Sequence, residues 1–70
     1  MNFNMFNPAI ATHYENLDAA IDHLARLINE GCSMNDTRLL QAVLRDHDLL
    51  NDGFSIDIQD MIAQAQRRAR

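Results

Sequence analysis

The chain has 70 residues, a formal charge of −4 and a hydrophobic content of 47%, which allow one small domain with a modest core. Its single cysteine, Cys32, excludes a disulfide within one chain, and no spacing of Cys and His residues suggests zinc. All ten acidic residues precede residue 61, and this acidic body argues against broad coating of DNA.

The size of the chain predicts that self-association stabilises it. A domain this small buries only about 60% of the surface of its unfolded chain, so burial and conformational entropy nearly cancel. Without disulfides or zinc, oligomerisation is the remaining source of stability, and we expect a homodimer.

Location in the cell is predicted from what the sequence lacks. The first residues carry no basic region ahead of an apolar run, and no stretch approaches the roughly 20 apolar residues of a membrane span. One unpaired cysteine fits a reducing compartment. We therefore expect a cytoplasmic protein that does not interact with membranes.

The first seven residues, MNFNMFN, form a segment distinct from the single helical domain expected over residues 8–70. Phe3, Met5 and Phe6 are large apolar residues outside any predicted helix. Aromatic and methionine side chains are favoured anchors in interfaces, so these three are candidate contacts with a larger host or regulatory protein. The alternative is that they fold back over the first helix or over a dimer mate.

The first helix is predicted over residues 8–30. Asn7 is a suitable N-cap, Pro8 favours the first helical position, and Gly31 is suited to end the helix. Apolar residues recur at alternating spacings of three and four, which is typical of a coiled-coil interface. This apolar seam is the predicted dimer interface and consists of Ile10, Tyr14, Leu17, Ile21, Leu24 and Ile28.

An acidic stripe lies on the same predicted helix, opposite part of the apolar seam. Glu15, Asp18 and Asp22 recur at helical spacing. The usual meaning of such a stripe is a solvated helix face. The functional alternative is contact with a basic partner or mimicry of a phosphate backbone, which makes these residues further candidate partner contacts.

The second helix is predicted over residues 36–51. Asn35 is the expected N-cap, with Met34 and Leu39 placed as a hydrophobic staple. The helix is expected to stop at Gly53. The face predicted to be apolar consists of Leu39, Leu40, Val43, Leu44, His47 and Leu50.

The third helix is predicted over residues 56–68, with Ser55 as N-cap. Its apolar residues recur at helical spacing, and the chain ends in an arginine cluster that complements the helix dipole. The alternative use of Arg67, Arg68 and Arg70 is contact with nucleic acid. The second predicted helix carries few basic residues beside several acids, so it is a poor reader of the major groove.

The segment LRDHDLLNDG, residues 44–53, places carboxylates around a histidine and raises the question of a metal or acid–base site. Adjacent residues of a helix diverge by about 100°, so Asp46, His47 and Asp48 point in three directions and cannot jointly bind one ion. Leucines also interrupt the alternating oxygen ligands that an EF-hand loop requires. We therefore predict a helix end with solvated acids and a histidine at the edge of the core.

The other chemically active side chains give no site. His13 and His23 are ten residues apart and about 280° in phase on the first predicted helix, so they cannot chelate one ion within a monomer. His23 lies beside the apolar seam, and we expect it to flank the seam and touch solvent; the alternative is that it packs at a subunit interface. Cys32 has no recognisable base beside it. We expect no catalytic residue, metal, cofactor or small-molecule substrate.

The run LARLINEGCSMNDTRLLQAVL joins an apolar helix to a second helix through a short capped turn. The pattern consists of Gly31, Met34, Asn35, Asp36, Leu39, Leu40 and Val43. Over about residues 17–50 it resembles the small helical biofilm and acid-stress regulators of enteric bacteria. These are connector proteins of two-component signalling with a dimeric fold likened to the Hha nucleoid modulators. The resemblance implies a dimeric regulator that acts by protein contact, and it supplies no catalytic residues.

These observations predict an all-α protein, a small three-helix bundle with a long first helix that dimerises through the apolar seam. The expected function is a non-enzymatic regulatory or inhibitory adaptor that binds a larger protein and modulates its activity. The alternative is a nucleic-acid-associated transcriptional regulator that uses the arginine cluster. An enzyme would require a pocket at the dimer interface around His23 or His47, for which the sequence gives no positive sign.

Overall fold

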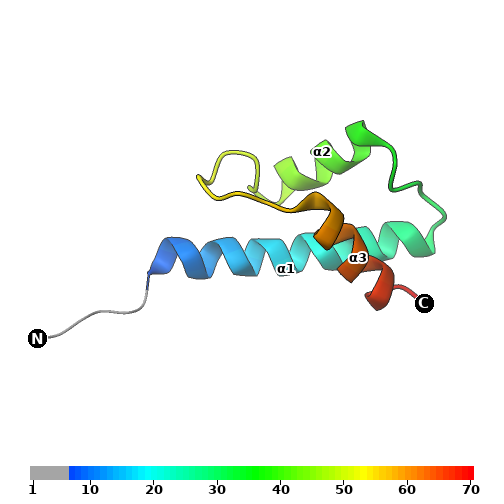
Figure 1. Ribbon diagram of the computed structural model, residues 1–70, viewed down its shortest axis with the longest axis horizontal. Helices are drawn as coiled ribbons and strands as arrows, with labels where there is room; N and C mark the ends of the chain where they lie inside the picture. Colours follow the sequence, from blue (N-terminus) through cyan, green and yellow to red (C-terminus); the bar gives the residue numbers. More distant parts are fainter. Residues whose placement is uncertain (1–6) are drawn as a thin grey trace, which may run out of the picture.

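The computed structural model describes residues 7–70, which form three helices: α1 (Pro8–Asn29), α2 (Thr37–Asp46) and α3 (Ile58–Arg68) (Figure 1). No strand occurs within these described residues, so the all-α prediction is confirmed. The predicted anchors Phe3, Met5 and Phe6 lie outside them.

The long helix α1 is the element on which the other two helices pack. Figure 1 shows α3 crossing α1 at a steep angle over its C-terminal half, while the segment between α2 and α3 passes above the N-terminal half. The packing of α3 on α1 is the more extensive of the two helix contacts. The N-terminal half of α1 therefore lacks a helical neighbour.

Both ends of α1 follow from local chemistry. The Oδ1 atom of Asn7 accepts a hydrogen bond from the amide of Ala9 at 2.9 Å, which confirms Asn7 as N-cap. At the other end Gly31 has a φ of 91° and donates to the carbonyl of Ile28, and Cys32 donates to that of Leu27, each at 3.0 Å. This pair of bonds is a Schellman motif, and the predicted role of Gly31 is confirmed.

The N-caps of the two shorter helices differ from those predicted. Asp36 caps α2, because its Oδ1 accepts from the amides of Arg38 and Leu39, whereas the amide of Asn35 bonds the Ser33 hydroxyl within the turn. The prediction of Asn35 was therefore wrong by one residue.

Asp57 caps α3 in the same way, because its Oδ1 accepts from the amide of Asp60 at 3.0 Å. Ser55 was the predicted N-cap, and that prediction was wrong. Ser55 and the residue after it lie outside any helix, which lets Ile56 pack against the core. A carboxylate two residues further on then starts α3.

The second helix ends at Asp46 rather than near residue 51. Asp48 has a φ of 58°, the left-handed region, and Leu49 donates to the carbonyl of Leu44 at 2.8 Å. This turn buries Leu49, which is 2% exposed, and leaves Leu50, the predicted core residue, 45% exposed. Burying a leucine contributes about 1.5–3 kcal/mol, which exceeds the roughly 1–2 kcal/mol cost of the left-handed conformation.

The core lies where α3 and α2 meet the C-terminal half of α1. Its buried residues are Ala20, Ile21, Leu24, Ala25, Leu40, Val43, Leu44, Leu49, Met61, Ile62 and Ala65. Between residues 7 and 70 no helix combines the length and the apolar character that crossing a membrane requires.

Candidate functional site

The predicted apolar seam of α1 is divided between the core and the surface. Ile21 and Leu24 are each only 2% exposed in the isolated chain, because α3 packs on α1 at these residues. Ile10 and Tyr14 are 42% and 63% exposed, and Leu17 is half-buried. The core residues of the seam are thus not free to meet a second copy, and dimerisation stays a prediction.

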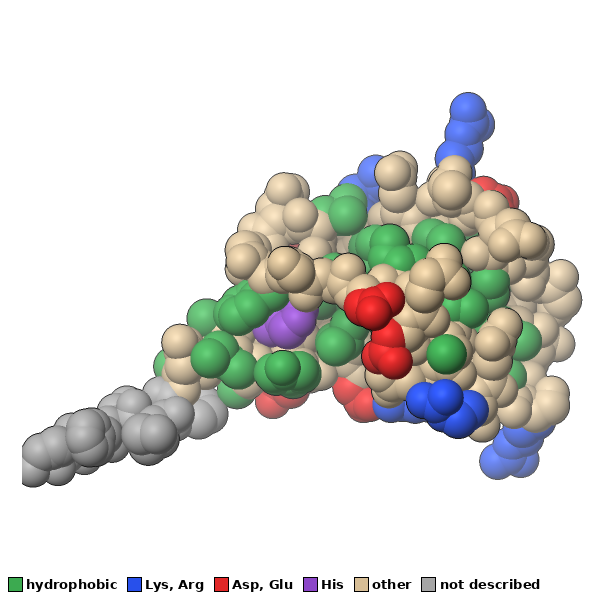
Figure 2. Space-filling model, viewed as in Figure 1, with side chains coloured by type: hydrophobic (Ala, Val, Ile, Leu, Met, Phe, Trp, Pro, Cys, Tyr) green, Lys and Arg blue, Asp and Glu red, His purple; other side chains and the backbone are tan. Residues whose placement is uncertain are grey.

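The exposed part of the seam is the candidate functional site. We define the exposed stripe as Ile10 and Tyr14, and the half-buried Leu17 packs against the core next to it. In Figure 2 hydrophobic side chains gather over the N-terminal half of α1, and acidic side chains lie along its lower edge. A large aromatic side chain left this accessible beside apolar neighbours is typical of a protein-binding surface.

A groove between α1 and α3 continues the exposed stripe toward the core. Its volume is about 270 Å³. The lining residues are Tyr14, Leu17, Asp18, Ile21, Gln64 and Arg68. The groove combines apolar side chains with polar and charged ones, so apolar contacts can give affinity and polar groups can fix orientation.

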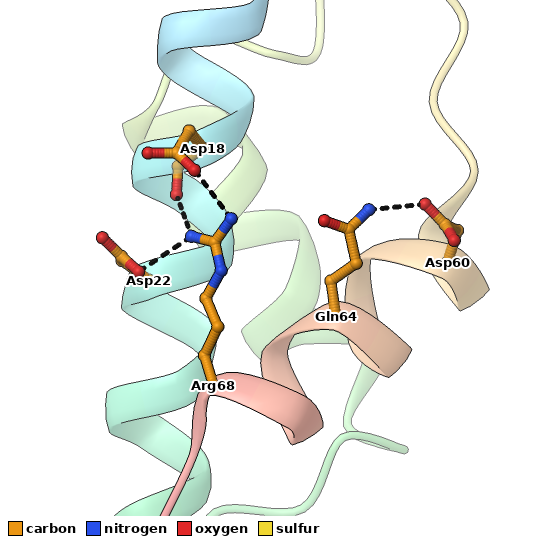
Figure 3. Close-up of polar contacts among 5 residues, drawn as sticks. All are labelled: Asp18, Asp22, Asp60, Gln64 and Arg68. Atoms are coloured by element: carbon orange, nitrogen blue, oxygen red, sulfur yellow. Dashed lines mark hydrogen bonds and ion pairs between the residues drawn. The ribbon is translucent and has the colours of Figure 1, made fainter.

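Arg68 of α3, which lines this groove, binds two carboxylates of α1 (Figure 3). Its Nη2 donates to Asp18 Oδ1 at 2.7 Å, and its Nη1 donates to Asp22 Oδ1 at 2.8 Å and to the Asp18 carbonyl at 3.2 Å. The hydrogen bonds that Arg68 donates to Asp18 and, to a smaller extent, to Asp22 raise the pKa of Arg68. All three side chains remain partly solvated, so the contact chiefly fixes the position of α3.

The three residues of the acidic stripe therefore have different surroundings. Asp18 and Asp22 meet Arg68, whereas Glu15 is exposed, and no ion pair within residues 7–70 includes it. The acidic stripe keeps a net negative charge beside the exposed stripe, since one arginine faces two carboxylates. Its role in partner binding stays a prediction.

The arginine cluster is dispersed rather than gathered into one patch. Arg68 turns onto α1, while Arg67 is exposed. The backbone amide of Arg70 donates to Asn29 Oδ1 at 2.7 Å, which ties the last residue to the far end of α1. The use of the cluster in binding nucleic acid stays a prediction.

A buried histidine that the sequence did not reveal flanks the exposed stripe on its other side. His13 is 6% exposed, and its Nδ1 lies 2.5 Å from Asp52 Oδ2. The ring stacks on Phe54 at a centroid distance of 4.5 Å and meets Tyr14 edge-on at 5.4 Å. His13 is buried because the segment after α2 covers it.

Asp52 links this histidine to the loop that carries it. Its Oδ1 accepts from the amide of Phe54 at 3.0 Å, so one carboxylate closes a turn and holds the imidazole. The hydrogen bond with His13, followed by that from Phe54, lowers the pKa of Asp52. The contact anchors the loop to the N-terminal half of α1. A pair separated by 39 positions has no local signal beyond the turn-forming Asp52-Gly53 step.

A second histidine contact joins α1 to the end of α2. His23 Nδ1 lies 3.0 Å from His47 Nε2, with the rings edge to face. One imidazole must donate and the other must accept in such a contact. Within residues 7–70 no group of three or more His, Cys, Asp or Glu side chains could hold a metal ion. Cys32 is half-buried in the turn after α1 and is a free thiol.

The described polar contacts therefore position helices and loops around α1, and Ile10 and Tyr14 remain exposed on its N-terminal half. Tyr14 stands between the Arg68 contacts on one side and the His13 ring on the other. When the chain was compared with protein-family models, with curated proteins and with solved structures, none of the three comparisons returned a match.

Proposed function

We propose that this protein is a non-enzymatic regulatory or inhibitory adaptor that binds a larger protein through the N-terminal half of α1. The observation that carries the proposal is the exposure of Ile10 and Tyr14 on the same helical face that forms the core further along. Exposed apolar surface of this kind costs free energy in water, and covering it with a partner recovers that free energy.

The surroundings of the exposed stripe support this use. The Arg68 contacts and the His13–Asp52 pair hold the elements on both sides of Tyr14. A surface that is rigid before binding loses little conformational entropy when a partner docks. Tyrosine is also among the side chains that most often dominate interface energetics.

Two further elements belong to the proposal. Phe3, Met5 and Phe6 directly precede α1 in the sequence and would add apolar anchors at the same end. Homodimerisation, which the size of the chain predicts, would compete with the partner if it used this same surface. The resemblance to small helical bacterial regulators favours a regulatory outcome over a purely structural one.

The test is affinity capture with the intact chain, tagged at its C-terminus, followed by direct binding to the purified candidate. Tyr14→Glu places a charge on the exposed stripe, and Gln41→Glu places the same charge on an exposed position of α2. We expect a stoichiometric protein partner with wild type and Gln41→Glu, lost with Tyr14→Glu and unaffected by nuclease. Equal capture by Tyr14→Glu would refute the proposed surface, and capture that nuclease abolishes would favour the nucleic-acid alternative.

A further inference from the structure

The protein contains its own example of how the α1 seam is covered. Helix α3 lies on the C-terminal half of the seam with Met61 and Ala65 buried at 2% and 0% exposure. Seven positions after Met61, Arg68 reaches across to the carboxylates of Asp18 and Asp22. An amphipathic helix with apolar residues at i and i+4 and an arginine at i+7 is therefore the element that fits this seam.

The N-terminal half of the same seam presents similar chemistry without a cover. Ile10 and Tyr14 continue the apolar face. Asp18 lies one helical turn after Tyr14, and Glu15 is an exposed acid about 100° around the helix from Tyr14. The side chain of Asp18 is still 64% exposed after binding Arg68. Residues 8–22 contain three acidic residues and no lysine or arginine, so the surface is apolar with a negative margin.

We propose that the N-terminal half of α1 binds an amphipathic helix of a partner protein, with apolar residues on one face and arginine or lysine at its edge. The inference rests on the proposed function and specifies the chemistry of the partner. The apolar side chains of that helix would cover Ile10 and Tyr14, and its cation would meet Glu15 and the free side of Asp18. This mode is the docking of a helix into an apolar groove.

Charge complementarity selects this occupant over the others. In a second copy the same stretch of α1 would bring acidic residues against acidic residues, and like charges facing each other oppose association. An anionic lipid surface and a nucleic acid are disfavoured for the same reason. A cationic helix both covers the apolar face and neutralises the margin.

The experiment uses the intact chain and two synthetic helices of about 20 residues, a length at which a helix becomes stable on its own. The first carries leucine at i and i+4 and arginine at i+7, the spacing of Met61, Ala65 and Arg68. The second replaces each arginine with glutamate. Tyr14 is the chain's only tyrosine and there is no tryptophan, so its fluorescence reports on this surface when the peptides lack aromatic residues.

We expect the arginine helix to change the Tyr14 fluorescence saturably and to bind about tenfold more tightly than the glutamate helix at low salt. Added salt should reduce this difference, because the charges are exposed. Equal affinity of the two helices, or no response to the arginine helix, would overturn the inference.

Two variants separate local recognition from general attraction to an acidic chain. Glu15→Arg and Asp46→Arg change the net charge equally, but Asp46 is an exposed residue at the end of α2. The preference for the arginine helix should disappear with Glu15→Arg and persist with Asp46→Arg. Equal loss in both variants would overturn the inference, as would a dimer seen by sedimentation that Tyr14→Glu dissociates.

Failure here and failure of the proposed function are distinguishable. Equal binding of the two synthetic helices to the Tyr14 surface removes the charge requirement and leaves a protein-binding surface in place. Capture of a partner that is unaffected by Tyr14→Glu removes the surface itself, whatever the helices do.

Discussion

Asp48 ends α2 in the same backbone conformation in which Gly31 ends α1. Their φ angles are 58° and 91°, and each is followed by a residue whose amide reaches back to a carbonyl in the last turn of the helix. Glycine adopts this conformation freely, whereas aspartate pays for its Cβ atom. The C-terminal ends of α2 and α1 thus share a backbone geometry, but only the end of α2 carries the strain of a side chain in the left-handed region.

Replacing Asp48 with glycine should therefore stabilise the protein by about 0.5–1 kcal/mol, because relief of the left-handed strain outweighs the added entropy of the unfolded chain. Urea unfolding followed by circular dichroism measures the change. Gly31→Ala is the matched opposite and should destabilise by about 1 kcal/mol, although no atom beyond its two chain neighbours lies within 4 Å of the added methyl group. An Asp48→Gly variant no more stable than wild type would contradict this account.

The adjacent leucines after α2 should behave very differently. Leu49→Ala leaves a cavity in the core and should cost about 2–5 kcal/mol, a large part of the stability of a domain this size. Leu50→Ala should change stability by no more than about 0.5 kcal/mol, since that side chain is exposed. Urea midpoints of the two variants decide the matter, and the reverse order would restore the longer α2 predicted from the sequence.

The His13–Asp52 pair should make stability depend on acidic pH. Because the pKa of Asp52 is lower in the folded chain than its ordinary value of 3.8, its contribution is fully present above pH 3.8. That contribution is lost as the pH falls through the lowered pKa. Asp52→Asn should be less stable than wild type at pH 5, and the difference in melting temperature should shrink toward pH 2. A difference independent of pH would assign the effect to the turn at Phe54 instead.

Charges introduced at two positions of the seam should separate core from surface. Ile21→Asp buries an unpaired carboxylate and should abolish the folded circular dichroism spectrum. Tyr14→Asp should keep that spectrum and a cooperative thermal transition, because the side chain is exposed. A folded Ile21→Asp chain would mean that the core is not the one described.

The contact of Arg68 with α1 should control the end of α3. Arg68→Gln removes both ion pairs, and we expect faster amide hydrogen exchange in the last turn of α3 with little change in the midpoint of unfolding. Arg67→Gln is the control, since Arg67 is an exposed neighbour. Equal exchange in the two variants would show that packing of α3, rather than Arg68, holds this turn.

The sequence predicted helix ends correctly where the capping residue has one strongly preferred position. Asn7 and Pro8 at the start of α1 and Gly31 after it each have one strongly preferred use, and the structure has them there. The end of α2 was missed because an aspartate in the left-handed conformation has no distinctive sequence signal. Only the burial of Leu49, a tertiary effect, makes that conformation favourable.

The candidate site could be predicted only in part, because it depends on contacts between residues that are far apart in the sequence. An alternation of three and four residues shows that α1 has an apolar face, but it does not say whether another chain or α3 covers that face. In the structure α3 covers Ile21, whereas Tyr14 stays exposed. The burial of His13 likewise requires a partner 39 residues away.

The bond between Arg70 and Asn29 has a practical consequence for how the protein is immobilised. It places the last residue at the far end of a helix of 22 residues, roughly 30 Å from Pro8 at a rise of 1.5 Å per residue. A sensor surface or bead attached through the C-terminus therefore leaves Tyr14 facing the solution, whereas attachment at the opposite end would crowd the site to be measured.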